Sequence, residues 1–248
     1  MEFCPPLGSP GPALVAARRK GLSMPPFADR TDAGRQLAEL LPAFRGDDVV
    51  VLCLPGRGVR VAAELASALR VLIDVILVRS LVVARRPSVR YGILGEDGAL
   101  IIDTAALAHG AIRASERAYT ERVQKNILHR NASAYRGVRT RVALDNRTAI
   151  VAHDCLTEPT VVRDACRIAR LLGAIRIVIA VPVADHRSLG ALAAYADNIV
   201  CPNQTTAPPT ATHWYLGPDT TTRADVANLL AALSPNHPRR QPVPLYRV

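Results

Sequence analysis

The sequence predicts an α/β fold: a doubly wound, mainly parallel five-stranded sheet flanked by helices. Three observations support this prediction. Short continuous apolar runs of strand length recur along the chain, and such runs are typical of strands that are buried on both faces of a parallel sheet. Helical patterns follow most of these runs, which is the order of βαβ units. The 248 residues, 49% of them hydrophobic, are enough to bury one large core.

The elements are expected in a regular order. The first helix is predicted within 31–44, capped by Thr31 or Asp32. The predicted strands are 48–54, 73–79, 148–154, 174–183 and 198–201. The later helices are predicted within 60–70, 160–172, 185–196 and 221–233. Between the second and third strands, a β arm near 80–102 is expected, with two short segments joined by a Gly-Glu-Asp-Gly turn, and then an arginine-rich helical stretch over 104–134.

One folded domain is expected over residues 28–235. A leader over 1–27 is rich in proline and glycine, which predicts disorder, and a C-terminal tail follows over 236–248. Met1 and Met24 are both candidate first residues, because regular patterning begins just after Met24.

The formal charge is +10, and arginine supplies nearly all of the positive charge, since the chain has only two lysines. Either a GC-rich coding bias or selection for guanidinium chemistry explains this composition. Residues 111–147 carry nine basic side chains against three acidic ones, a local charge of +6. Such a stretch either attracts RNA or another polyanion, or forms a solvated helix face.

The cysteines indicate a reducing compartment, because all five are scattered without C-x-x-C spacing. Cys53 and Cys166 lie in apolar patterns and are expected to pack as small hydrophobes. No apolar run has the length of a membrane span, and residues 1–23 do not match a signal peptide. A cytoplasmic protein without a membrane segment is therefore expected, with a homo-oligomer left open.

Ligands of a doubly wound sheet bind beyond the carboxyl ends of its strands. The loops at that edge are 55–60, 79–84, 153–161 and 202–219. Their segments "VVVLCLPGRGVRVAAELASAL", "TAIVAHDCLTEPTVVRDACR" and "HWYLGPDTT" occur in the order and spacing of the type I phosphoribosyltransferase family, which the chain resembles from about residue 27 to 233. The resemblance implies transfer of a phosphoribosyl group from 5-phosphoribosyl 1-pyrophosphate (PRPP) to a nitrogenous base, with magnesium bound to the donor.

The resemblance also implies roles for residues in the matching loops. The catalytic pair that faces the ribose corresponds to His153 and Asp154. PRPP binding is expected from residues of three loops: Arg57, Gly58, Arg79, Ser80, Cys155, Leu156, Thr157 and Thr160. Trp214 and Tyr215 offer an aromatic surface on which a base can stack, or else form a hydrophobic plug at the sheet edge. No residue is assigned as a metal ligand.

The loops depart from the family's pattern in ways that affect phosphate binding. Where the family has L-P-R-G-G-V, this chain has Leu54 to Val59 with arginine and glycine exchanged. Where the family has R-K-L-G, this chain has Arg-Ser-Leu-Val at 79–82, so the lysine is absent. In the third loop, Pro159 removes an amide donor. Glu158 places a carboxylate near the phosphate, and two unit charges ~4 Å apart repel by about 4 kcal/mol at an intermediate dielectric. Alternatively, Glu158 turns outward and Pro159 simply starts a helix.

Three functions remain open at this point. The first is a phosphoribosyltransferase, a glycosyltransferase of nucleotide metabolism, with a weakened PRPP site. The second is a non-catalytic regulator of the same fold that binds a nucleotide or RNA. The third is an inactive paralogue, a pseudoenzyme that keeps only the core.

Overall fold

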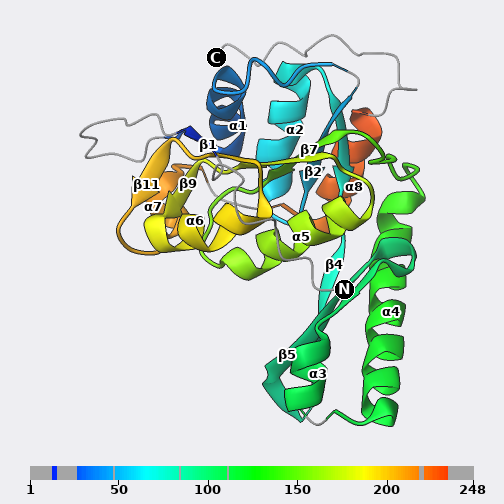
Figure 1. The fold of residues 1–248 in the computed structure, drawn as a ribbon. Helices are drawn as coiled ribbons and strands as arrows, with labels where there is room; N and C mark the ends of the chain where they lie inside the picture. Colours follow the sequence, from blue (N-terminus) through cyan, green and yellow to red (C-terminus); the bar gives the residue numbers. More distant parts are fainter. Residues whose placement is uncertain are drawn as a thin grey trace.

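The computed structural model describes residues 13–15, 27–46, 48–83, 85–110, 112–217 and 221–233. Its centre is a parallel six-stranded sheet in the order β1-β10-β8-β7-β2-β3 (Figure 1). The strands are β1 (Ala13–Val15), β2 (Val49–Cys53), β3 (Leu72–Val75), β7 (Thr148–Ala152), β8 (Arg176–Ala180) and β10 (Asn198–Val200). The doubly wound α/β fold and its five predicted strands are confirmed. The sixth strand, β1, falls within the predicted leader; the rest of 1–26 and the tail 236–248 lie outside the described residues.

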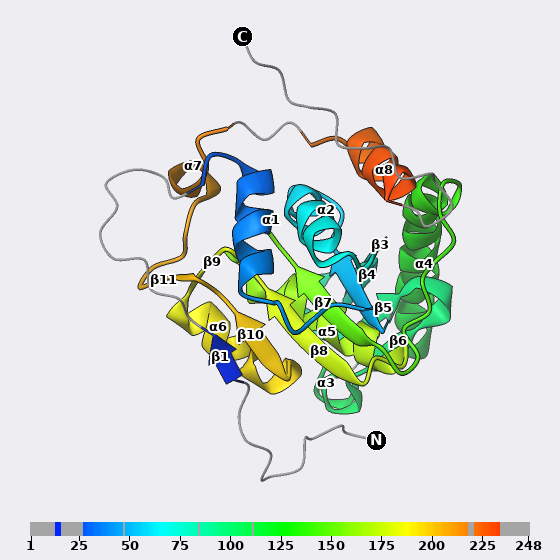
Figure 2. The same cartoon turned by 90° about the horizontal axis from the view of Figure 1, so that it is seen from above.

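Helices cover both faces of the sheet (Figure 2). On one face lie α1 (Arg30–Glu39) and α2 (Gly58–Leu69), and on the other lie α5 (Pro159–Leu171) and α6 (His186–Leu192). Alternate residues of β2 enter the two hydrophobic layers: Val51 packs with α1 and α2, whereas Leu52 packs with α5. Both side chains are buried, and each such burial stabilises the fold by roughly 1.5–3 kcal/mol. The continuous apolar run of this strand is thus explained by burial on two faces.

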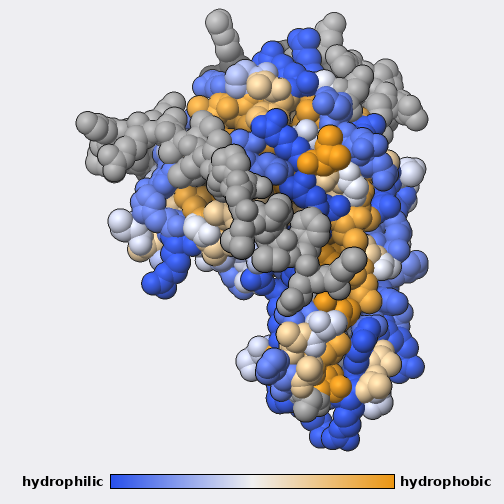
Figure 3. Space-filling model, viewed as in Figure 1, coloured by the Kyte–Doolittle hydropathy of each residue, from blue (hydrophilic) through white to orange (hydrophobic). Residues whose placement is uncertain are grey.

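An arm leaves the sheet after β3 and projects from the body of the molecule (Figure 1). It contains the antiparallel strands β4 (Val78–Val83), β5 (Arg86–Gly95) and β6 (Leu100–Ile102), with the 3₁₀ turn η1 (Glu96–Gly98) between β5 and β6. Two helices, α3 (Thr104–His109) and α4 (Ala114–Arg136), follow. Figure 3 shows apolar surface along this arm. The predicted arm and its Gly-Glu-Asp-Gly turn are confirmed, with three strands in place of two segments.

Three predicted boundaries are wrong. The strand predicted at 73–79 ends at Val75, because the chain leaves the sheet there and Val78 pairs with Gly95 inside the arm. The cap of α1 is Asp29, whose carboxylate accepts from the Asp32 amide at 2.8 Å. The stretch 104–134 forms two helices, since α3 ends at His109 with Gly110 as its C-cap residue.

The remaining elements lie around the carboxyl edge and the end of the chain. They are β9 (Val183–Asp185), η2 (Ala193–Tyr195), β11 (Asn203–Thr205), α7 (Ala211–Trp214) and α8 (Arg223–Ala232). β9 and β11 form a separate two-stranded parallel sheet beside the loop after β7. No helix in the described ranges is both long and apolar enough to cross a membrane.

A largely buried ionic network fixes the arm to the sheet. Arg136, at the end of α4, binds Asp74 of β3 at 2.7 Å and Glu96 of η1 at 2.7 Å. Asp74 is only 1% exposed and also accepts from the Val142 amide at 2.8 Å. Burial raises the pKa of the Asp74 carboxyl, and the Arg136 guanidinium opposes this shift by favouring the charged form. The Arg136 guanidinium therefore joins three segments that are far apart in the sequence: β3, η1 and α4.

Arg136→Met is expected to lower the free energy of unfolding by about 3 kcal/mol, because it leaves two mostly buried carboxylates without their counter-charge. Urea unfolding followed by circular dichroism measures this change. Arg130→Met is the matched control, since Arg130 is an exposed residue of the same helix whose guanidinium bonds to the Asn126 carbonyl. Equal unfolding midpoints for the two variants would contradict the network's role.

The four cysteines of the described part of the chain are buried and carry free thiols: Cys53, Cys155, Cys166 and Cys201. Burial raises the pKa of Cys155, Cys166 and Cys201 to about 12, and that of Cys53 also rises. Cys53 and Cys166 pack in the two core layers, so their predicted role as small hydrophobes is confirmed.

Alkylation by iodoacetamide at pH 8 is expected to leave these four thiols unmodified in the native protein, because each is buried and almost wholly protonated. The same thiols are expected to react fully in guanidinium chloride. Peptide mass spectrometry measures both states. Rapid native labelling of Cys155 would show that the loop after β7 is more open than described.

Candidate functional site

A cleft of about 430 Å³ opens at the carboxyl ends of β2 and β7, where a doubly wound fold binds ligands. Two loops and α7 supply its lining: Gly56, Arg57, His153, Asp154, Cys155, Thr157 and Ala211. Five of the residues singled out in the sequence are thus brought to one place. The cleft is large enough for a sugar phosphate.

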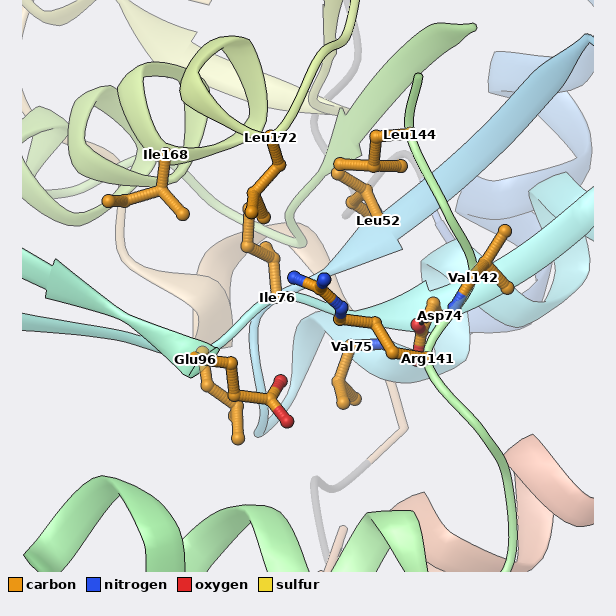
Figure 4. Close-up of a pocket in the computed structure, with 11 residues that line it drawn as sticks. Leu52, Asp74, Val75, Ile76, Glu96, Arg141, Val142, Leu144, Ile168 and Leu172 are labelled. Carbon is orange, nitrogen blue, oxygen red and sulfur yellow. Dashed lines mark hydrogen bonds between the residues drawn. The ribbon is translucent and has the colours of Figure 1, made fainter. Parts of the chain in front are cut away.

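A second cavity lies at the base of the arm and is lined mainly by apolar side chains (Figure 4). Asp74, Glu96 and Arg141 are its charged neighbours. Its volume of about 10 Å³ admits no more than roughly one water molecule. Of these two spaces, only the cleft at the strand ends suits a ligand.

The loop after β2 lies directly against the loop after β7. A Cβ atom at Gly58 would lie 3.2 Å from the His153 Cα and 3.4 Å from the Asp154 amide nitrogen. The backbone at Gly56 has φ 134°, in the region that favours glycine. The two glycines thus shape the turn and permit the close approach, while Arg57 between them is exposed and lines the cleft.

Two helices begin beside the cleft, and neither has a side-chain cap. Arg57 is the N-cap residue of α2 and Glu158 that of α5, and neither side chain makes a capping hydrogen bond. In contrast, α1, α3, α6 and α8 each have a side chain that caps the first turn; α4 and α7 do not. Uncapped first-turn amides and the helix dipole favour an anion.

Glu158 is exposed and is not among the residues that line the cleft, whereas its neighbour Thr157 is. Pro159 occupies the first turn of α5, a position where proline fits because its missing N–H has no helical partner. The geometry therefore agrees with the outward orientation of Glu158. Repulsion between this carboxylate and a phosphate is correspondingly weak.

The loop after β7 is held in place by its own backbone. The amide of His153 donates to the Ala180 carbonyl at 3.2 Å, and the amide of Leu156 to the Val183 carbonyl at 3.0 Å. Leu156 itself is buried in the core. These bonds tie the loop to β8 and β9, so its position does not depend on a ligand.

Asp154 is engaged inside the protein. Its carboxylate is 2% exposed, and Oδ2 accepts from Nε of Arg30 at 2.9 Å. Oδ1 lies 3.3 Å from Nδ1 of His153. That Nδ1 also lies 3.1 Å from the Cys155 carbonyl. The Cys155 amide also lies 3.4 Å from Nδ1. Backbone and side-chain partners therefore surround Nδ1, which leaves Nε2 of the half-buried His153 as the ring nitrogen for a ligand.

The aromatic pair predicted to stack on a base is turned toward the core. Tyr215 is buried, stacks on Phe27 with ring centroids 5.5 Å apart, and donates its hydroxyl to the Asp154 carbonyl at 2.5 Å. Burial raises the pKa of this hydroxyl. Trp214 is half-buried against the same core layer. Neither residue is among those that line the cleft, so this geometry agrees better with the plug.

The two residues assigned to the loop after the second strand lie elsewhere. Nε of Arg79 donates to Gln124 of α4 at 2.9 Å, and Oγ of Ser80 donates to Asp164 of α5 at 3.2 Å. Both belong to β4 and hold the arm against helices. Thr160, in contrast, stands in the first turn of α5, three residues beyond Thr157.

Sequence reasoning missed Arg30, which the fold brings next to the site from 124 positions away. Before a predicted helix, a single arginine gives no signal of a buried partner. Several basic residues of 111–147 also have internal partners. Arg117 pairs with Glu121 at 2.7 Å, Arg141 with Asp97 at 3.2 Å, and the buried Arg139 donates to the Leu233 carbonyl. With Arg136, these contacts reduce the charge that the stretch offers to a polyanion.

Comparisons with known proteins agree with the fold. No model of a protein family matches the chain. Over 175 residues, 71% of the chain, it is 38% identical to proteins named "Putative phosphoribosyl transferase" from two strains of Mycobacterium tuberculosis, CDC 1551 and H37Rv. The chain spans 40% of the length of these curated relatives. The crystal structure of TT1426 from Thermus thermophilus is 31% identical, with a TM-score of 0.76 over 84% of this chain and 99% of that one. The chain belongs to the phosphoribosyltransferase family.

Proposed function

We propose that the chain binds PRPP in the cleft between the loops after β2 and β7 and transfers its phosphoribosyl group to a nitrogenous base. One observation carries this proposal: Arg57 and two helix starts without side-chain caps adjoin a single cleft of about 430 Å³. Positive charge and open amides at two points suit a ligand with phosphate groups at both ends.

In this proposal, each of the two loops binds one phosphate-bearing end of PRPP. Arg57 and the first turn of α2 attract the pyrophosphate, while Thr157, Thr160 and the first turn of α5 bind the 5′-phosphate. His153 lies between these groups and donates or accepts a hydrogen bond at the ribose. The loop after β7 is already held by β8 and β9, so little ordering is needed when the ligand binds.

The reaction breaks the bond between C1 of the ribose and the pyrophosphate oxygen, and pyrophosphate leaves with the electron pair. A nitrogen of the acceptor base supplies the electron pair of the new C1–N bond and loses its proton to solvent. The ribose carries positive charge between these events. The contribution of the protein is then mainly positioning and electrostatic stabilisation of the departing pyrophosphate.

Magnesium enters this proposal with the substrate. No group of three His, Cys, Asp or Glu side chains suited to a metal ion occurs among the residues that the structure describes. The carboxylate that lines the cleft, that of Asp154, is already paired with Arg30. We therefore assign Mg²⁺ to the pyrophosphate oxygens, since this ion prefers oxygen ligands and commonly binds through substrate phosphates.

A regulator that binds RNA has less support. Arg117, Arg136, Arg139 and Arg141 of the basic stretch have internal partners. The cleft, in contrast, offers groups suited to a small phosphorylated ligand. A steep fall of RNA affinity with rising salt would favour the regulator instead.

Isothermal titration of the wild-type protein with PRPP and magnesium is expected to show one binding site. Arg57→Ala is expected to weaken this binding about tenfold or more, because a charge-assisted contact to pyrophosphate contributes roughly 1.5–3 kcal/mol. Arg122→Ala is the control, since Arg122 is an exposed residue of α4. No wild-type binding at millimolar PRPP would remove the proposal.

Turnover is tested separately by pyrophosphate release in the presence of PRPP, magnesium and a panel of purine and pyrimidine bases. The expected result is release that requires one class of base and that Arg57→Ala reduces. Tight binding of PRPP without release for any base would identify a non-catalytic binding protein.

A further inference from the structure

The carboxylate of Asp154 is held from several sides. Arg30 donates to Oδ2 at 2.9 Å, and its guanidinium carbon lies 4.5 Å from the ring centroid of Tyr215. The Tyr215 hydroxyl in turn donates to the Asp154 carbonyl. Arg30 is 4% exposed and Asp154 2% exposed. The three residues therefore form one buried group, which we call the Arg30 clamp.

The clamp joins three segments that are distant in the sequence. Arg30 begins α1, Asp154 lies in the loop after β7, and Tyr215 follows α7. Around it, the amides of Leu216 and Gly217 donate to the carbonyls of Phe27 and Ala28 at 3.2 and 2.9 Å. Movement of Asp154 toward a ligand would have to break this ion pair between two buried side chains, which is costly.

The charges at the cleft depend on this pair. Asp154 lines the cleft beside Arg57, and an uncompensated carboxylate there would cancel much of the attraction of Arg57 for a phosphate. With Arg30 bound to it at 2.9 Å, Asp154 adds no net charge. The positive charge of Arg57 then acts on a ligand without opposition from its neighbour.

We infer that Asp154 is a positioning residue that does not contact the sugar, and that Arg30, by neutralising it, determines the affinity of the cleft for phosphate. This inference rests on the proposed function of the cleft. It reassigns the acidic residue that the family resemblance places on the ribose hydroxyls. Asp154 instead fixes the loop and the His153 ring, and His153 is the residue that meets the ribose.

The test measures the affinity of ribose 5-phosphate and of inorganic phosphate by isothermal titration for four proteins: wild type, Asp154→Asn, Arg30→Met and the double variant. Asp154→Asn removes the negative charge and keeps that of Arg30, so both ligands are expected to bind equally well or more tightly. Arg30→Met exposes the cleft to an unpaired carboxylate, so both are expected to bind at least tenfold more weakly. The double variant is neutral at both positions but lacks the contact that fixes the loop, so its affinity for inorganic phosphate is expected to lie between those of Arg30→Met and wild type.

Arg30→Lys provides a second comparison in case Arg30→Met does not fold, which circular dichroism will show. Lysine restores the charge but not the fork of donors, and is expected to keep phosphate affinity within threefold of wild type. A purely structural role predicts instead that affinity falls with thermal stability across the variants, whatever the charge at position 30.

Weaker binding of ribose 5-phosphate to Asp154→Asn by more than threefold, with phosphate affinity unchanged, would overturn the inference, because it would place the carboxylate on the ribose. Loss of both affinities in the double variant, with its fold retained, would overturn it as well. Failure of the proposed function is distinguishable, since the wild-type protein itself would then bind neither ligand.

Discussion

The ion pair between Arg30 and Asp154 is the contact on which the organisation of the cleft depends. Its two side chains lie 2.9 Å apart and are almost completely buried. Burial of two charges is costly, and a pair of this kind contributes little net stability unless hydrogen bonds satisfy both ions. The Tyr215 ring and the His153 imidazole supply part of that environment. What the pair gives the protein is a fixed position for the loop after β7 relative to α1.

A similar device holds the arm. Arg136 links β3, η1 and α4 through two mostly buried carboxylates, so this arginine of the basic stretch has a structural role. In both places an arginine joins segments that no regular hydrogen-bond ladder connects. The composition of the chain, rich in arginine and poor in lysine, suits this use, because the planar guanidinium offers several donors to carboxylates in different directions. The charge of +10 therefore overstates what a polyanion would meet.

The sequence predicted the fold well and the site in part. Strands β2, β7 and β8 followed from continuous apolar runs, because burial on both faces requires apolar side chains at every position. The end of β3 did not follow from such a run, since the arm that comes after it is equally apolar. The loops near Arg57 and Thr157 were located from their place after strands. The internal pairing of Asp154 and the inward packing of Tyr215 depend on contacts over 124 and 61 positions, for which local patterns carry no signal.

We expect phosphate groups to bind at the starts of α2 and α5 while Asp154 stays paired with Arg30. A crystal structure of the protein soaked with ribose 5-phosphate shows whether both conditions hold together. The 5′-phosphate is expected beside Thr157 and the first turn of α5, the ribose near His153, and the contact between Arg30 and Asp154 unbroken. A ribose bound by the Asp154 carboxylate, or a phosphate bound outside the cleft, would contradict this expectation.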